Sequence, residues 1–165
     1  MKRPRRYILT YLWTMPFDLL MWIFVLFVRG ICGTKLHWQE GLWCELRKGS
    51  FLAKKWAIDW AGVTLGHGGI YAPGYSGGPG IDTVCERHEH IHVEQYEAAM
   101  LAAFVFSITA VAAGADWRVC LMAWLLGGAI IYMASLIQAW LRGEKPYEGS
   151  HLEEAAYSQD GHKKG

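Results

Sequence analysis

Two long stretches without a charged side chain dominate the second half of the sequence. They cover residues 98–115 and 119–141, which is 18 and 23 residues. A helix needs about 20 apolar residues to cross the hydrocarbon layer of a bilayer. Only residues 116–118 separate the stretches, which is enough for a turn but not for a domain. The sequence therefore predicts two antiparallel helices that enter a membrane as a hairpin at about residues 98–141.

A third apolar stretch, residues 7–28, follows four basic residues at the N-terminus. Basic residues before an apolar run are typical of a signal anchor. Pro16 and Asp18 interrupt this run, so it either spans the membrane or lies in the interface. We expect residues 1–30 to form an N-terminal membrane anchor helix, and the whole chain to be an integral protein of a bacterial inner membrane.

The basic residues do not assign a membrane side to the loops. Eleven of them lie in the segments 29–87 and 142–164, against Arg118 alone in the hairpin turn, which favours a cytoplasmic position for these segments. The N-terminal basic cluster followed by a complete first span favours the opposite side. Both orientations stay open.

Residues 88–92 read His-Glu-His-Ile-His and fit the pattern H-E-x-x-H. On a helix, His88 and His92 lie about 40° apart on one face, so both imidazoles can bind one zinc ion at about 2.0–2.1 Å. Glu89 lies on the flank of that face, where it can take a proton from a water molecule activated by the ion. His90 points away. The pattern predicts zinc ligands at 88 and 92 and a catalytic base at 89.

A zinc ion held by two histidines of one helical turn needs a third protein ligand from elsewhere in the chain. The segment 146–157 reads PYEGSHLEEAAY and offers Glu153 and Glu154. A hairpin returns the chain to the face from which it started, so this segment is expected on the same side of the membrane as residues 88–92. A single span between them would have separated the ligands.

Together the two motifs resemble the gluzincin metallopeptidases, and most of all small membrane-associated bacterial members. The resemblance is carried by HEHIHVEQYE and, after the apolar stretches, by WLRGEKPYEGSHLEEAAY. It implies Glu153 as the third ligand, since Ala156 completes the family's E-x-x-A motif. Tyr157 stands where many gluzincins have an Asp that orients a zinc histidine. The implied fold is α+β, with a zincin-like core of a short β-sheet and the metal helix in a domain at residues 31–165, and the implied cofactor is Zn²⁺.

Residues 36–72 are expected to form short strands, at 42–47, 51–58 and 63–71, with a turn at 48–50. By resemblance, the strand at 63–71 would hold an extended substrate by backbone pairing, and its glycines would let another backbone approach. His67, between these glycines, either donates to a developing oxyanion or only bridges strand and loop. Tyr157 is a second candidate to supply a donor. Residues 72–80, rich in Gly and Pro, form either a mobile flap or a passive linker.

These features favour a membrane-embedded zinc metallopeptidase that hydrolyses peptides or membrane proteins at the bilayer surface. The net charge of +1 argues neither for nor against nucleic acid, but the absence of a basic, aromatic-rich stripe argues against it as a partner. One alternative is an integral membrane protein that binds a metal without catalysis. Another is an iron-dependent membrane oxygenase, because three histidines crowd into residues 88–92, although the remaining histidines are scattered singly.

Overall fold

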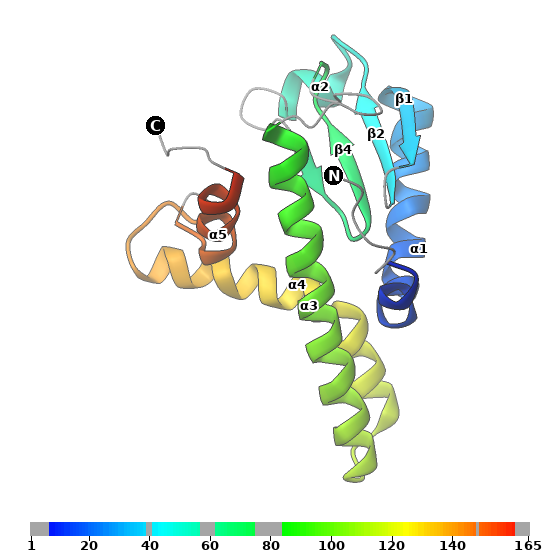
Figure 1. Cartoon of the computed structure of the whole chain (residues 1–165), viewed down its shortest axis with the longest axis vertical. Helices are drawn as coiled ribbons and strands as arrows, with labels where there is room; N and C mark the ends of the chain where they lie inside the picture. Colours follow the sequence, from blue (N-terminus) through cyan, green and yellow to red (C-terminus); the bar gives the residue numbers. More distant parts are fainter. Residues whose placement is uncertain (1–6, 39–40, 57–61, 75–83, 148, 161–165) are drawn as a thin grey trace.

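The computed structural model describes residues 7–38, 41–56, 62–74, 84–147 and 149–160 (Figure 1). Its elements are, in order, α1 (Tyr7–Cys32), β1 (Gly33–Trp38), β2 (Leu42–Leu46), α2 (Phe51–Trp56), β3 (Gly62–Thr64), β4 (Gly68–Tyr71), α3 (Val84–Ala112), α4 (Trp117–Leu141) and α5 (His151–Asp160). The fold is α+β, as expected, and combines a small four-stranded sheet with two long apolar helices.

The sheet has the strand order β1-β2-β4-β3, in which only β2 and β4 run parallel. Neighbouring residues of a strand face opposite sides of a sheet. Leu46 and Ile70 accordingly pack on one face with Val28 of α1. On the other face Trp43 and Tyr71 stack at 4.8 Å and pack against Val93 of α3. Helices α1 and α3 therefore cover opposite faces, and β3 lies at an edge.

Helix α1 bends by 78° between its parts Leu9–Met15 and Phe17–Cys32, with Pro16 between them. A proline inside a helix removes one backbone hydrogen bond and kinks the helix. The helix packs on β1, β2, β4 and α3, yet it keeps exposed apolar side chains such as Leu12 (71% exposed) and Phe27 (63%). It is a third candidate span only if its two parts count as one.

Helices α3 and α4 form the expected hairpin. Both are long and apolar enough to cross a membrane. Asp116 caps α4, since its carboxylate accepts a hydrogen bond from the backbone N of Arg118 at 2.8 Å. The Ser107 hydroxyl donates to the Cys120 carbonyl at 2.8 Å, and a Cβ added at Gly127 would approach the Ala103 Cβ to 2.3 Å. Small residues thus let the two helices pack closely, as they do in membranes.

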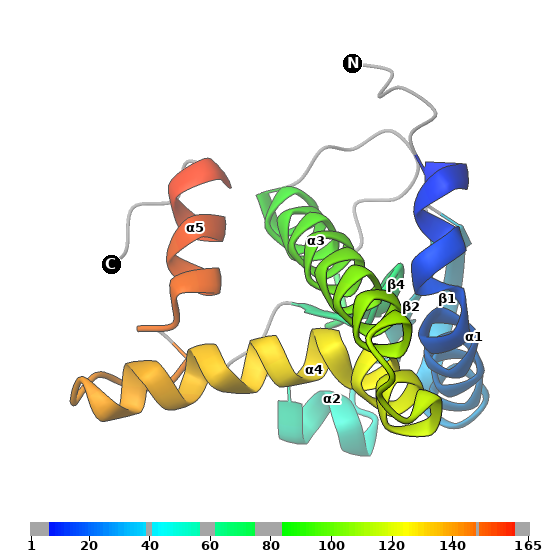
Figure 2. The ribbon, with the colours of Figure 1, turned by 90° about the horizontal axis from the view of Figure 1, so that it is seen from below.

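The second half of α4 leaves α3 and runs across the molecule towards α5, as Figures 1 and 2 show. Gly127 and Gly128 lie near the middle of this helix, and paired small residues are a common cause of helix kinks. The change of direction brings α5 next to the first half of α3. After the hairpin the chain therefore returns to the first half of α3, and the second half of α4 displaces it laterally across the molecule.

The strand expected at 51–58 is wrong, because residues Phe51–Trp56 form α2. Ser50 caps this helix. Its hydroxyl accepts a hydrogen bond from the backbone N of Ala53 at 3.2 Å, and its carbonyl accepts one from the backbone N of Lys54 at 2.9 Å. Leu52, Ala53 and Lys54 also favour helix by intrinsic propensity. The capping serine was taken as part of a turn between strands.

The single strand expected at 63–71 is two strands of a hairpin, because the chain reverses between Thr64 and Gly68. Gly66 has a φ of +61°, a conformation that residues with a Cβ adopt only with strain. A Cβ at Gly69 would lie 2.1 Å from the Val63 carbonyl oxygen, so this glycine admits β3 and not a substrate. Of the segment expected as a flap or linker, residues 75–80 lie outside the described residues.

Candidate metal centre

Three side chains from two distant helices meet at one point. His88 and His92 lie on α3 and Glu153 lies on α5, and one ligand atom from each falls within 4.8 Å of the other two. The carboxylate oxygens of Glu153 are 3.2 Å from His88 Nε2 and 3.3 Å from His92 Nε2. The two Nε2 atoms are 3.1 Å apart. The structure thus brings together the three residues that the sequence proposed as ligands.

The spacing of these atoms fits a tetrahedral cation. Ligand atoms about 2.0–2.1 Å from a zinc ion lie about 3.3 Å from one another at the corners of a tetrahedron. The observed separations are 3.1 Å between the two Nε2 atoms, 3.2 Å from His88 Nε2 to Glu153 Oε2 and 3.3 Å from His92 Nε2 to Glu153 Oε1. Each imidazole thus lies at about this distance from the other and from one of the two carboxylate oxygens. Two imidazole nitrogens and one carboxylate oxygen are also a donor set that zinc accepts, with a fourth position left for water or substrate. The geometry and the chemistry of the three groups therefore suit the same ion.

Gln95 orients one of the histidines. Its side-chain amide nitrogen donates to the Leu152 carbonyl at 2.8 Å, because a carbonyl can only accept. Its amide oxygen then faces His92 Nδ1 at 2.8 Å and accepts the proton of that nitrogen. A neutral imidazole protonated at Nδ1 presents its lone pair at Nε2, where Glu153 and His88 converge. The sequence analysis left this partner unidentified, although a residue three positions after His92 shares its helix face.

The Gln95 contact also fixes α5, the helix that carries Glu153. A second anchor is Ser150, whose hydroxyl lies 2.9 Å from the Ser135 hydroxyl of α4 and accepts from the backbone N of Glu153 at 3.4 Å. Ser150 therefore caps α5 and joins it to α4. Contacts from Gln95 of α3 and from Ser135 of α4 thus hold α5, and with it the Glu153 carboxylate, in place.

Glu153 is the buried member of the Glu153–Glu154 pair. Its side chain is 1% exposed, whereas Glu154 is exposed and pairs with His151 at 3.4 Å. Burial by itself would raise the pKa of the Glu153 carboxyl, but hydrogen bonds and charge from His88 and His92, when these imidazoles are protonated, lower it to about 2. A bound cation would take the place of these protons, because only a deprotonated ring nitrogen binds a metal. The carboxylate is thus ionised and ready to bind a cation.

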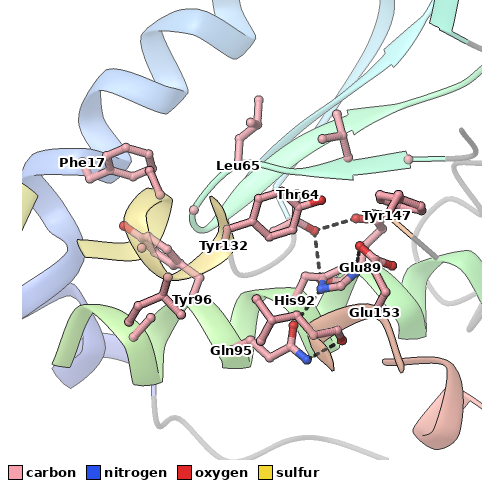
Figure 3. A pocket seen from close by; sticks show the side chains of 18 residues that line it. Phe17, Thr64, Leu65, Glu89, His92, Gln95, Tyr96, Tyr132, Tyr147 and Glu153 are labelled. Atoms are coloured by element: carbon pink, nitrogen blue, oxygen red, sulfur yellow. Dashed lines mark hydrogen bonds and ion pairs between the residues drawn. The ribbon is translucent and has the colours of Figure 1, made fainter. Parts of the chain in front are cut away.

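Glu89 lies beside the three candidate ligands and is 4% exposed. Its Oε2 accepts a hydrogen bond from the Thr64 hydroxyl of β3 at 2.6 Å (Figure 3). A Cβ added at Gly62 would lie 2.9 Å from Glu89 Oε1, so a larger residue there would displace the carboxylate. The edge strand thus holds the carboxylate from one side. No sequence pattern indicated the roles of Thr64 and Gly62.

A cavity of about 310 Å³ opens beside the centre and is lined by Glu89, His92 and Glu153 (Figure 3). Three tyrosines also line it. Tyr132 from α4 and Tyr147 from the segment before α5 lie near Glu153 and Glu89, whereas the Tyr96 hydroxyl donates to the Thr14 carbonyl at 3.4 Å. Burial, together with the negative charges of Glu153 and Glu89, raises the pKa of the Tyr147 phenol. The phenol therefore keeps its proton and can donate it in a hydrogen bond. Neither Tyr132 nor Tyr147 was among the expected site residues.

The other expected site residues lie elsewhere. The ring of Tyr157 packs against the ring of His88 with 4.7 Å between centroids, so it contacts a candidate ligand without lining the cavity. His90 is outside the ligand group and faces Glu94 at 3.9 Å. This placement disfavours a site built from a cluster of three histidines.

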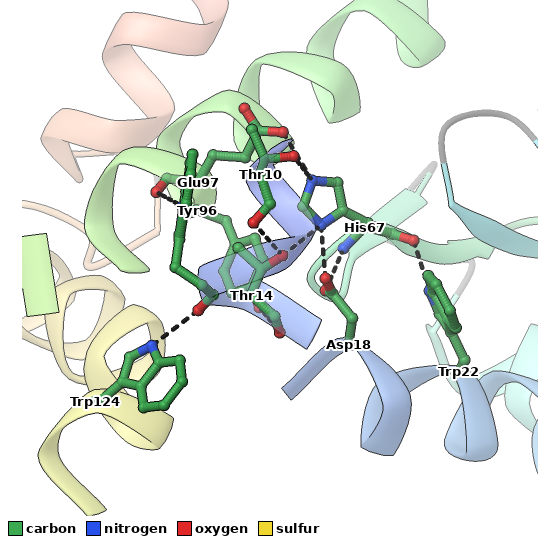
Figure 4. Close-up of polar contacts among 9 residues, drawn as sticks. Thr10, Thr14, Asp18, Trp22, His67, Tyr96, Glu97 and Trp124 are labelled. Atoms are coloured by element: carbon green, nitrogen blue, oxygen red, sulfur yellow. Dashed lines mark hydrogen bonds and ion pairs between the residues drawn. The ribbon is translucent and has the colours of Figure 1, made fainter. Parts of the chain in front are cut away.

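His67 does not line the cavity, because it is fully buried between two carboxylates (Figure 4). Its Nδ1 is 2.8 Å from Asp18 Oδ2 on α1, and its Nε2 is 2.7 Å from Glu97 Oε1 on α3. We call these three residues the His67 cluster. Burial opposes the charge of the imidazole, but the hydrogen bonds to Asp18 and Glu97 raise the pKa of His67 to about 9. His67 therefore links helices to the β3–β4 turn, and the expected oxyanion role has no support in its position.

Comparisons of the chain with protein-family models, with curated proteins and with solved structures find no match. The interpretation of the metal centre therefore depends on the geometry and chemistry of its residues.

Proposed function

We propose that this protein is a zinc-dependent metallopeptidase that hydrolyses peptide bonds at a membrane surface. The observation that carries the proposal is the convergence of His88, His92 and Glu153 within 4.8 Å, with the Glu89 carboxylate beside them in one cavity. A zinc ion at this point would supply Lewis-acid chemistry, lowering the pKa of a water molecule and polarising the scissile carbonyl. A zincin-like core is the corresponding proposal for the fold.

Glu89 acts as the general base and then as the general acid. It takes a proton from water while the water oxygen bonds to the carbonyl carbon of the substrate. It then passes this proton to the amide nitrogen as the carbon–nitrogen bond breaks, which releases an amine and a carboxylic acid, and the acid then gives its proton to the amine. The Thr64 hydroxyl, 2.6 Å from Glu89 Oε2, restricts the rotation of the carboxylate and keeps it facing the cavity.

Negative charge develops on the carbonyl oxygen during this step and needs a hydrogen-bond donor. Of the three tyrosines that line the cavity, Tyr132 and Tyr147 lie near Glu89 and Glu153, and the raised pKa of Tyr147 keeps it a donor. We assign this role to them in place of His67, because both ring nitrogens of His67 face carboxylates.

The position of the centre on α3 places the reaction near lipid. Six residues separate His92 from Ala98, where the uncharged stretch begins, which is about 9 Å along a helix. Helix α3 is unbroken over this interval. Peptides or membrane proteins presented at the bilayer are therefore the proposed substrates.

The test is the substitution Glu89→Gln in the full chain purified in detergent and loaded with zinc. Loss of the base should lower turnover of a fluorescent casein by about 100- to 10,000-fold. Zinc content should stay at the wild-type value, because Glu89 is not a ligand. A chelator should stop hydrolysis by the wild type.

The matched control is Glu94→Gln, since Glu94 is an exposed glutamate on the same helix. It should leave turnover unchanged. Undiminished hydrolysis by the Glu89→Gln protein would refute the assigned base. Zinc binding without hydrolysis of casein or of a peptide library by the wild type would favour a non-catalytic metal-binding protein.

A further inference from the structure

The cavity beside the metal centre extends well beyond it. Glu89, His92 and Glu153 lie at one end of the cavity, and Phe17 and Tyr96 lie at the other (Figure 3). Ala99 and Gly128 also line it, and a Cβ added at Gly128 would lie 2.9 Å from the Tyr96 ring. His92 and Ala99 are seven residues apart on α3, which is about 10 Å of helix. The cavity therefore runs along α3 from the ligands towards the hairpin.

The wall changes character along this length. The acidic and imidazole groups of the described lining are confined to the metal end. Farther along, the lining side chains are apolar or aromatic and include Phe17, Leu65 and Ile131. Phe17 and Tyr96 close this part of the wall with ring centroids 5.6 Å apart. A polar reaction centre thus continues into an apolar compartment, and this combination fits a ligand with a polar head and an apolar tail.

Hydrogen bonds between helices hold the apolar end of the cavity in shape. Trp124 of α4 donates its indole N–H to the Trp13 carbonyl of α1 at 2.8 Å (Figure 4). Trp13 in turn donates its indole N–H to the Glu97 carbonyl of α3 at 3.2 Å. These two bonds join the three helices that surround the apolar compartment, so its shape does not depend on one loose contact.

The rim of the cavity lies on the membrane helix α4. Ala129 and Ile131 line the cavity and are exposed residues of α4, with Ile131 39% exposed. Helix α4 is one of the two helices apolar enough to span a bilayer. A chain that leaves the cavity past these residues would therefore meet the apolar surface of a candidate membrane helix.

We propose, on the basis of the proposed hydrolase function, that the substrate is a peptide carrying a linear fatty-acyl chain near the scissile amide. The acyl chain enters the compartment from the bilayer side and the amide lies at the metal end. With the metal end included, the cavity runs about 10 Å along α3, which is longer than a single apolar side chain requires, whereas an extended alkyl chain joined to an amide at the metal end fills it. The cavity volume of about 310 Å³ is at the lower end of the range for small-molecule sites.

The test measures binding of two alkyl hydroxamates, acetohydroxamate and octanohydroxamate, to the zinc-loaded full chain in lipid nanodiscs. The hydroxamate group binds zinc and the alkyl chain probes the compartment, so the readout does not depend on turnover. We expect octanohydroxamate to bind at least about tenfold more tightly. Ala99→Leu, which places a larger side chain inside the cavity, should abolish most of this gain.

The control for Ala99→Leu is Ala102→Leu, which changes an exposed alanine three residues away on the same helix. This variant should keep the full gain in affinity for octanohydroxamate. The long chain partitions into lipid equally for all variants, so comparing the two variants cancels the contribution of the lipid. Equal affinity of the wild type for both hydroxamates, or a gain that persists in Ala99→Leu, overturns the acyl-chain proposal and leaves hydrolysis in place. Failure of the chain to bind zinc overturns both.

Discussion

Two buried groups of histidine and carboxylate lie along α3, and they differ in the ratio of the two residue types. At the metal centre two imidazoles share one carboxylate, that of Glu153. In the His67 cluster one imidazole lies between two carboxylates. The first arrangement leaves nitrogen lone pairs that converge on a point beside a cavity. The second directs both ring nitrogens at oxygens, so a doubly protonated imidazole satisfies it without a metal.

The difference shows how one residue type serves binding in one place and structure in another. The Nδ1 of His92 is satisfied by the neutral amide of Gln95, which leaves Nε2 as an acceptor. Both nitrogens of His67 face acids, so the imidazole becomes a cation that holds α1, α3 and the β3–β4 turn together. The partner of each nitrogen, and not burial alone, distinguishes a candidate ligand from a structural ion pair.

The largest effect is expected from Asp18→Asn, which removes one acid of the His67 cluster. Asp18 is fully buried and accepts from both the backbone N and the ring Nδ1 of His67, at 2.9 and 2.8 Å. Breaking a buried pair in this way costs about 3–5 kcal/mol of unfolding free energy. Denaturant unfolding in detergent measures the loss, and zinc binding by the folded variant should stay at the wild-type value.

Asp116→Asn is the matched control for Asp18→Asn. Asp116 is an exposed helix cap, and asparagine caps helices about as well as aspartate. Its stability should match the wild type. Loss of zinc binding by Asp18→Asn without loss of stability would contradict the structural role of the His67 cluster.

A smaller effect is expected from Gln95→Leu, which keeps the approximate size of the side chain but removes the acceptor for His92 Nδ1. Loss of such an orienting partner weakens metal binding by about 10- to 100-fold. Competition with a chromophoric zinc chelator gives the affinity. Gln138→Leu, at an exposed position of α4, should bind zinc like the wild type. An unchanged affinity in Gln95→Leu would remove the orienting role.

A further effect is the pH dependence that the His67 cluster gives to stability, which is gradual over several pH units. The pKa of His67 rises from its ordinary 6.5 to about 9 in the folded chain, so the folded state holds its proton more tightly. The stabilisation is complete below about pH 6.5 and is lost as the pH rises through about 9, by at most about 1.4 kcal/mol per pH unit. Unfolding free energies between pH 6 and 10 should fall for the wild type and fall less for Asp18→Asn. A wild-type stability that rises over this window contradicts the charged cluster.

The hairpin and the metal helix could be predicted from the sequence because each follows from a local pattern. The uncharged runs and the short turn at 116–118 fix two antiparallel helices, and the spacing of His88 and His92 matches one helical turn. No helix-breaking residue lies between His92 and the first uncharged run, so the continuous helix α3 follows. Glu153 could be proposed as a ligand because a hairpin returns the chain to the side on which His88 and His92 lie.

What the sequence could not show depends on tertiary contacts. Asp18 looked like an interruption of a membrane anchor, yet its position is explained by His67, 49 residues away in the sequence. The glycines at 66 and 69 were read as room for a substrate, whereas Asp18 and neighbouring backbone occupy that space. A short helix at 51–56 was missed because its signal is one capping serine. The first two misses concern partners that only the folded chain supplies, whereas the third concerns a local capping signal.

Zinc-edge X-ray absorption of the zinc-loaded full chain, beside the Glu153→Gln variant, tests the metal centre most directly. We predict one zinc ion per chain, bound by two imidazole nitrogens and by oxygen at about 2.0–2.1 Å. The Glu153→Gln variant should bind zinc at least about 100-fold more weakly, since it loses a ligand and not only an orienting partner. A chain that binds no stoichiometric zinc, or a spectrum without imidazole that is the same in both proteins, would contradict the proposed centre.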